Sequence, residues 1–377
     1  MQPIYLDYNA TTPIAREVAD VMADYLYDHF GNPSSSHSYG VQAKLAVEFA
    51  RKQIADLIGA QPGEIIFTSG GTEANNYAIR GYCWQNQDKG KHIITSAIEH
   101  PAVLEVCRHL ERQGFSLTIL AVDESGLVRA EDLEAAIRKD TILISIMHAN
   151  NEVGTIQPIK VFSEIAHKHE VVFHSDAAQT VGKIPVNVNE LEVDLLSIAG
   201  HKLYAPKGIG VLYVREGVEL RNLMFGAGHE GGKRPGTENV LEIVGLGKSC
   251  EIAARDLEQN QKIMKENRDF LFLELKNAFG EDRIRLNGHE ELRLPNTLNI
   301  SIKNVQAHDL LNRINDRLAI SAGSACHADQ VTVSSVLQAM GVPPEWAQGA
   351  LRISVGRETS REQITQAVAI LKTEINQ

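Results

Sequence analysis

Cysteine is scarce in this sequence. The chain of 377 residues has only four cysteines, and no two of them form a Cys-x-x-Cys pair. A disulfide framework or a zinc ribbon needs more cysteines at closer spacing. Few, scattered thiols fit a reducing compartment, so we expect a cytoplasmic protein.

Positive charge is also in deficit. The 37 lysines and arginines are outnumbered by 48 aspartates and glutamates, which gives a formal net charge of −11. A nucleic-acid surface needs a basic stripe, and docking on an anionic membrane needs a basic patch. We therefore expect no direct contact with nucleic acid and none with a membrane.

Long apolar runs are missing as well. No stretch of 18 apolar residues occurs, so we expect no transmembrane helix. Residues 1–7 lack the basic and apolar regions of a secretory signal. The 43% hydrophobic and 23% charged residues are ordinary for a globular protein, and the length allows two or three domains.

Between about residues 63 and 214, short β-branched runs alternate with helix-like stretches. Strands are predicted at 64–68, 92–95, 117–122, 142–147, 171–174, 195–198 and 209–214. Helices are predicted between some of them, at 102–112, 131–139 and 158–169. This alternation predicts an α/β fold with a mostly parallel sheet covered by helices.

The remainder of the chain has a different pattern. One or two long helices are predicted over 241–279, and a smaller α+β unit follows. In that unit, strands are predicted at 298–302 and 351–355 and helices at 308–318 and 361–372. We predict a large domain over 15–250, and a small domain that combines 1–14 with 251–377 and carries Cys326.

Polar residues follow five of the predicted strands. In chain order they are Gly70-Gly71-Thr72, then Glu99 and His100, then 148–152, then Asp176 and Gln179, then His201 and Lys202. Ligands of parallel sheets bind beyond the carboxyl ends of the strands. Five such ends at one rim predict a binding site.

Three of these strand ends favour a phosphate-bearing cofactor. A helix that starts at Gly71 would offer unpaired N–H groups to a phosphate, although an ordinary turn with a Thr72 cap is the alternative. Asp176 and Lys202 are the pair that pyridoxal phosphate uses, since a lysine carries it as a Schiff base and an acid keeps its ring nitrogen protonated. Asp176 can also cap a helix, and the two roles can coexist.

The four cysteines fall into two groups. Cys107 shares a helix face with hydrophobic residues, and Cys83 and Cys250 lie in helical stretches, so we expect all three to be buried. Cys326 lies in the small, polar run 321–327, which is typical of a loop with an accessible thiol. His327 beside it either favours the thiolate or is incidental. The histidines at 167 and 169 are expected to be a polar helix end and not a metal site.

Nine segments together carry a family resemblance. They are YLDYNATTP at 5–13, FGNPS at 30–34, FTSGGTE at 67–73, EH at 99–100, NNEVG at 150–154, DAAQ at 176–179, GHK at 200–202, GTEN at 236–239 and GSAC at 323–326. The set resembles the NifS/IscS-type cysteine desulfurases, which are class V aminotransferases with the fold-type I pyridoxal-phosphate fold. The resemblance covers nearly the whole chain.

The resemblance implies three catalytic residues. Lys202 resembles the lysine that carries pyridoxal phosphate and moves the substrate's α-proton. His100 resembles the imidazole that stacks on the cofactor ring and shuttles protons. Cys326 resembles the nucleophile that becomes a persulfide.

The resemblance also implies a set of binding residues. Asp176 would pair with the ring nitrogen, and Gln179 would bond the ring hydroxyl. The phosphate would be bound by Gly71, Thr72 and His201, and by Thr237 from a second subunit, which implies a homodimer. Asn151 would lie between cofactor and substrate. Arg352 would bind the substrate carboxylate by a bidentate pair of hydrogen bonds.

The implied reaction removes sulfur from L-cysteine and yields L-alanine and a persulfide on Cys326. The segment from Cys326 to Leu337 is as long as in desulfurases that pass sulfur to an acceptor protein. An iron–sulfur scaffold or a thiolation protein fits that role.

One residue departs from the family pattern. Many members have a serine where this chain has Ala199, so we expect looser binding of the phosphate. Selenocysteine lyases, which release selenide, resemble the chain at 234–239 and 326–327 too and are an alternative. A transaminase, a C–S lyase that releases pyruvate and a non-catalytic scaffold are further alternatives.

Overall fold

The computed structural model describes residues 3–322 and 333–375. A seven-stranded sheet has the order β2-β8-β7-β6-β5-β3-β4. Its strands are β2 (Ile65–Thr68), β3 (His92–Ser96), β4 (Ser116–Leu120), β5 (Thr141–Ser145), β6 (Val172–Asp176), β7 (Leu195–Ala199) and β8 (Gly210–Val214). The pairs that β8 forms with β2 and β7 are antiparallel, and the other four pairs of the sheet are parallel. The predicted α/β fold with a mostly parallel sheet is confirmed.

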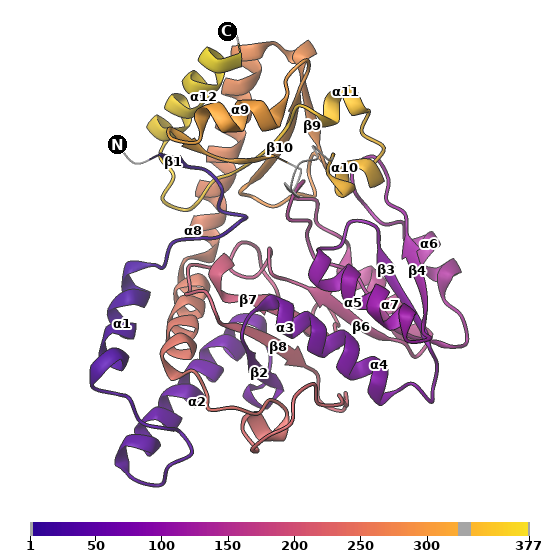
Figure 1. Ribbon diagram of the computed structural model, residues 1–377, viewed down its shortest axis with the longest axis vertical. Helices are drawn as coiled ribbons and strands as arrows, with labels where there is room; N and C mark the ends of the chain where they lie inside the picture. The colour runs from indigo at the N-terminus through magenta and orange to yellow at the C-terminus, as the bar shows by residue number, and fades with distance from the viewer. Residues whose placement is uncertain (1–2, 323–332, 376–377) are drawn as a thin grey trace.

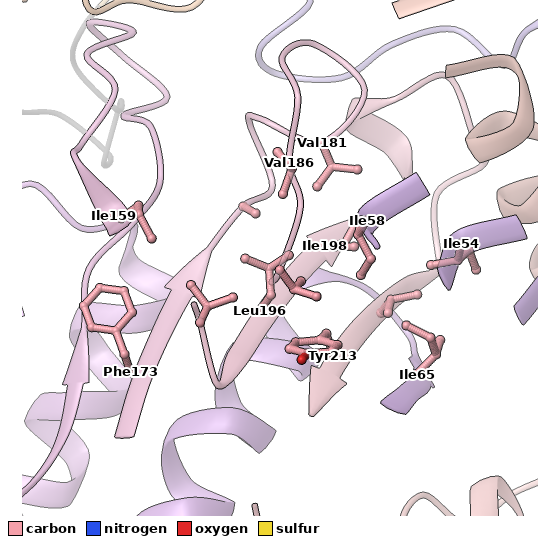
Figure 2. Packing of buried hydrophobic residues seen from close by; sticks show 14 of the residues in the cluster. Ile54, Ile58, Ile65, Ile159, Phe173, Val181, Val186, Leu196, Ile198 and Tyr213 are labelled. Atoms are coloured by element: carbon pink, nitrogen blue, oxygen red, sulfur yellow. The ribbon is translucent and has the colours of Figure 1, made fainter. Parts of the chain in front are cut away.

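Apolar side chains on both faces of this sheet explain its two helical layers. Strands of a parallel sheet are covered on both sides, so they are hydrophobic along their whole length. Leu196 and Ile198 of β7 pack with Ile54 and Ile58 of α2 (Ser38–Ile58) in one core (Figure 2). Leu195 points to the other face, where α3 (Gly71–Asn76), η2 (Tyr77–Gly81) and α5 (Pro101–Arg112) supply the second core.

A single helix, α8 (Val240–Phe279), runs through 40 residues. Its N-terminal half contributes Leu246 and Cys250 to the core of the seven-stranded sheet. Its C-terminal half contributes Leu271 and Leu275 to a different core. Figure 1 shows α8 extending from the seven-stranded sheet to the second group of strands.

The second group is a four-stranded antiparallel sheet of order β12-β13-β10-β9. The strands are β9 (Ile284–Asn287), β10 (Thr297–Ile302), β12 (Ser321–Ala322) and β13 (Ala350–Ser354). Helices α9 (Ala307–Ile314) and α12 (Arg361–Ile375) pack on it. The division into domains at 14/15 and 250/251 stays a prediction, which the separate core of this sheet supports.

One predicted helix is longer than the observed one. The helix expected at 308–318 ends at Ile314, because Leu318 enters β11 (Leu318–Ala319) and pairs with β1 (Ile4–Tyr5). That partner lies more than 300 residues away, so local periodicity could not indicate it.

The remaining helices are short or peripheral. They are α1 (Arg16–Tyr27), η1 (Pro62–Glu64), α4 (Tyr82–Gln85), α6 (Ala130–Ala136), α7 (Ile159–Lys168), η3 (Gly200–Lys202), η4 (Glu230–Gly232), η5 (Glu281–Arg283), α10 (Ser335–Ala339) and α11 (Pro344–Ala347). Among the described residues, no helix has the length and apolar character that crossing a membrane requires.

Candidate active site

A cavity of about 340 Å³ lies where the parallel strands end. All five predicted strand ends contribute to it, together with the N-terminal segment and β13. Its lining includes Asn9, Ala10, Gly71, Thr72, Asn75, His100, Asn151, Asp176, Gln179, Ala199, His201, Lys202 and Arg352. The structure therefore brings together nine of the sequence-predicted site residues: Gly71, Thr72, His100, Asn151, Asp176, Gln179, His201, Lys202 and Arg352.

Helix α3 begins directly at the edge of the cavity. Gly70 is its N-cap, with a φ of 150° that residues with a side chain rarely adopt, and no side chain caps the helix. The alternative of an ordinary turn with a Thr72 cap is therefore wrong. A Cβ on Gly71 would lie 3.2 Å from the Cβ of Ala199, so the glycine lets the turn pack against β7.

Asp176 is the last residue of β6, and its carboxylate is fixed on both oxygens. Oδ2 accepts a hydrogen bond from Asn75 Nδ2 at 2.7 Å, and Oδ1 accepts one from the Ala178 backbone N–H at 2.9 Å. A turn and not a helix follows, so Asp176 holds this turn without capping a helix. Asn75 is buried and was not predicted. It lies one helical turn after Gly71, and this spacing was a usable signal that its side chain is near the same site.

Lys202 lies in η3, directly after β7. Its Nζ donates to the backbone oxygens of Asn9 at 2.5 Å and Ala10 at 2.7 Å. Burial, and then the positive charge of Arg352, lower the pKa of Lys202 to about 8. A larger share of the amine is therefore uncharged near neutral pH than for an ordinary lysine, and the uncharged amine is the nucleophile.

Both histidines of the cavity are held in their neutral form. His100 Nδ1 accepts from the Ala102 backbone N–H at 3.1 Å, so its proton belongs on Nε2. Burial lowers the pKa of His100, and Lys202 acts in the same direction. Burial and neighbouring lysines lower the pKa of His201 to about 4, and its Nδ1 lies 3.1 Å from Thr11 Oγ1.

A buried lysine that was not predicted orients Gln179. Lys183 Nζ donates to Gln179 Oε1 at 2.8 Å and to Asn9 Oδ1 at 3.2 Å. Gln179 Nε2 in turn donates to the backbone oxygen of Asn9 at 3.1 Å. Because Gln179 Oε1 accepts from Lys183, the amide nitrogen is the end that is turned toward Asn9. Burial lowers the pKa of Lys183 well below its usual range.

Arg352 reaches the cavity from the middle of β13. Its Nη2 donates to Asp7 Oδ1 at 2.9 Å and to Ser321 Oγ at 3.1 Å, and Nη1 is 3.4 Å from the backbone oxygen of Asn151. Asp7 and Ser321 were not assigned a role from the sequence. Both lie far from Arg352 along the chain.

Two predicted residues do not line the described cavity. Thr237 is exposed, on the segment between η4 and α8. Two ion pairs anchor this segment: Glu230 with Arg51 at 2.7 Å, and Arg234 with Glu73 at 3.0 Å. Cys326 lies outside the described residues.

Some polar residues at the strand ends serve the loops and not the cavity. Glu99 Oε1 accepts from Ser96 Oγ at 2.6 Å and from the Met147 backbone N–H at 2.9 Å, and burial raises the pKa of Glu99 to about 8. Asn150 Oδ1 accepts from the backbone N–H groups of Glu152 and Val153. These bonds shape the turns that present His100 and Asn151.

The other cysteines are buried, as predicted. Burial raises the pKa of Cys107 and of Cys250 to about 12, and that of Cys83 well above its usual value. His167 is bonded to Asp194 at 2.9 Å. In the described part of the chain, no three His, Cys, Asp or Glu side chains cluster as a metal site would require.

Comparison with known proteins gives the same assignment as the motifs. The family described as Aminotransferase class-V matches residues 4–367. This chain belongs to the class-V aminotransferase family. The resemblance predicted from the nine segments is thereby confirmed.

Relatives within the class-V family are similar over nearly their full length. The cysteine desulfurase IscS of Dictyoglomus turgidum is 48% identical over 370 residues, which are 98% of this chain and 93% of that protein. The IscS of Methanosarcina thermophila is 46% identical over 98% of this chain and 91% of its own. A solved NifS-like protein superposes with a TM-score of 0.93 at 37% identity and covers all of both chains.

Proposed function

We propose that this protein is a pyridoxal-phosphate-dependent cysteine desulfurase that removes sulfur from L-cysteine and releases L-alanine. One observation carries the proposal: the amine of Lys202 and the carboxylate of Asp176 face the same cavity, and the pKa of that amine is lowered to about 8. The relatives named IscS support cysteine as the substrate and do not favour the selenocysteine-lyase alternative.

The residues of the cavity fit pyridoxal phosphate. Gly71 and Thr72, in the first turn of α3, line the cavity beside a neutral His201, where backbone N–H groups and the Thr72 and His201 side chains would bind a phosphate. Asp176 would pair with the ring nitrogen, Gln179 would bond the ring hydroxyl, and Asn151 would lie between cofactor and substrate. About 340 Å³ is also in the range of sites for small ligands.

The bound cofactor would supply an electron sink for the bonds at the substrate's α-carbon. Lys202 would hold the cofactor and, once displaced by the substrate amine, take the α-proton on its uncharged Nζ. A pKa of about 8 suits this exchange, because the amine can both accept and return a proton near neutral pH.

Other residues orient the substrate and move its sulfur. Arg352 and Asn151 would hold the carboxylate, and His100, with its proton on Nε2, would shuttle protons at the cavity. The Cys326 thiolate would attack the substrate sulfur, so that an S–S bond forms as the C–S bond breaks. Alanine would leave, and Cys326 would carry the persulfide to an acceptor such as an iron–sulfur scaffold or a thiolation protein.

The surface of the chain supports the proposed homodimer. Tyr27, Phe30, Phe49 and Phe225 have 81, 71, 61 and 85% of their surface exposed. Exposed aromatic side chains in such number, on α1, on α2, between these helices and between β8 and η4, favour contact with another protein. In a homodimer, Thr237 would reach the cavity of the second subunit. We further propose a cytoplasmic location, which the few scattered thiols support.

The decisive experiment is a product assay on the purified holoenzyme and its Cys326→Ala variant. The native protein should release alanine from L-cysteine and gain one sulfur atom by mass spectrometry. Cys326→Ala should retain the visible cofactor band and lose sulfur transfer, because it keeps the cavity but has no acceptor thiol.

Cys107→Ala is the matched control, since it removes a thiol from the core and should leave persulfide formation intact. Persulfide formation by Cys326→Ala would contradict the assignment of Cys326. A protein that takes up no pyridoxal phosphate would contradict the whole proposal, and pyruvate as the product would indicate a C–S lyase.

A further inference from the structure

Arg352 is bonded to a carboxylate of its own chain that does not line the cavity. Asp7 Oδ1 accepts from Arg352 Nη2 at 2.9 Å, and Asp7 Oδ2 accepts from Ser321 Oγ at 2.9 Å. Ser321 Oγ in turn accepts from the same Nη2 at 3.1 Å. The Asp7 and Arg352 side chains are only 15 and 12% exposed, so the pair is poorly screened by water.

The hydrogen-bond donors of Arg352 limit what it can offer from this position. Nη2 carries two N–H groups, and both are used, by Asp7 and Ser321. Nη1 has one weak partner, the Asn151 oxygen at 3.4 Å, and the buried Nε has none among the described residues. A two-pronged bond to a carboxylate uses Nη2 together with either Nη1 or Nε. Neither pair of donors is free while Nη2 is held.

We propose that the Asp7 carboxylate competes with the substrate carboxylate for Arg352. Asp7 occupies the Nη2 end of Arg352 until the substrate carboxylate replaces it there. Asp7 thereby sets how tightly the site binds carboxylates. This inference rests on the proposed function, in which Arg352 binds the substrate carboxylate.

Backbone hydrogen bonds beside Asp7 hold this residue in place, so that Arg352 is the side chain that moves in the exchange. The Leu6 N–H donates to the Ala319 oxygen at 2.9 Å, and the Leu6 oxygen accepts from the Ser354 N–H at 2.8 Å. Asp7 therefore stays in place when Arg352 turns to a ligand, and among the described residues its carboxylate then keeps only the Ser321 hydroxyl as a side-chain hydrogen-bond partner. A carboxylate that is only 15% exposed is unfavourable without its cation, so each binding event loses part of its free energy.

A different role for Asp7 predicts the opposite sign. If Asp7 only positioned Arg352, removal of its charge would weaken the binding of a carboxylate. If Asp7 competes, removal of the charge strengthens that binding. Asp7→Asn separates the two roles, because asparagine keeps the shape and an acceptor oxygen but lacks the charge.

The test measures binding of trifluoropropionate to the holoenzyme by fluorine NMR, with neutral trifluoropropionamide as the matched ligand. Trifluoropropionate has a carboxylate but no amine, so its binding requires no turnover. Asp7→Asn should lower its Kd about tenfold, which corresponds to ~1.4 kcal/mol. Binding of the amide should not change.

The control variant is Asp316→Asn, which removes an exposed carboxylate near Arg317 on the surface and should leave both Kd values unchanged. An unchanged or higher Kd for trifluoropropionate in Asp7→Asn would overturn the inference. If Asp7→Asn does not fold, Asp7→Ser replaces it, because it also removes the charge that holds Nη2. That variant should again lower the Kd about tenfold, and an unchanged or higher Kd would again overturn the inference.

Arg352→Gln distinguishes this inference from the proposed function. Loss of the preference for the anion in Arg352→Gln, without tighter binding in Asp7→Asn, would contradict only the competitor role. An anion preference that persists in Arg352→Gln would contradict the proposed role of Arg352 itself.

Discussion

The seven-stranded and the four-stranded sheet each have a fully buried central strand, β7 and β10, yet the two sheets contribute very differently to the cavity. The seven-stranded sheet supplies side chains after five of its strands, from Gly71 to Lys202. The four-stranded sheet supplies Arg352, from the middle of β13.

The difference follows from strand direction. Parallel strands end at the same edge, so the residues after them converge on one place. The ends of antiparallel strands alternate between the two edges of a sheet, so the residues after them do not converge. A side chain of such a sheet therefore reaches the cavity from the middle of a strand, as Arg352 does. We therefore expect residues from the seven-stranded sheet to determine cofactor binding and Arg352 to determine substrate binding.

The largest expected effect comes from Lys202→Ala. Turnover of L-cysteine should fall by about 10³-fold or more, since proton transfer by a positioned group contributes 10²- to 10⁴-fold and the anchor of the cofactor is lost as well. Borohydride reduction followed by peptide mass spectrometry should find no cofactor on the chain. Lys207→Ala, which removes an exposed lysine nearby, should behave like the native protein. Loss of trifluoropropionate binding in Lys202→Ala would show that the seven-stranded sheet also determines substrate binding, and would contradict the division of roles between the two sheets.

The next effect is that of Arg352→Gln. The KM for L-cysteine should rise about 10²-fold, because two charge-assisted hydrogen bonds to the carboxylate are lost. Cofactor uptake, followed by the visible band, should stay close to that of the native protein. Arg313→Gln, on the surface near Glu374, is the control. A variant that loses the cofactor instead would show that the four-stranded sheet also holds it.

The smallest effect is a dependence on pH. Because burial lowers the pKa of Lys202 to about 8, the fraction of uncharged amine should rise about tenfold between about pH 7 and about pH 9. The rate at which the apo-protein takes up pyridoxal phosphate covalently should rise by the same factor, as stopped-flow absorbance can measure. A rate that still rises steeply above about pH 9 would indicate an ordinary lysine and a more open cavity.

Sequence reasoning identified the strand-end residues because their convergence needs only strand order and direction. His100, Asp176 and Lys202 could be assigned to one rim before any contact was known. Asn75 was missed although its place one helical turn after Gly71 was a usable signal. Lys183 and Asp7 could not be assigned, since each acts through a partner at least four residues away in sequence. The long helix at 308–318 was wrong because Leu318 pairs with β1, a contact that local patterns do not contain. The Thr72 cap was wrong because the N-cap of α3 is Gly70, so that Thr72 lies inside the helix.

The sequence by itself determined the family, the α/β fold and the residue types that the chemistry needs, because motifs and periodicity are local properties. Only the tertiary structure decided how those residues are tuned. The lowered pKa of Lys202 and the bonds that hold Arg352 depend on desolvation and on charges brought together from segments as far apart as residues 7 and 352. Such interactions depend on distance in space, and the order of residues along the chain does not specify that distance.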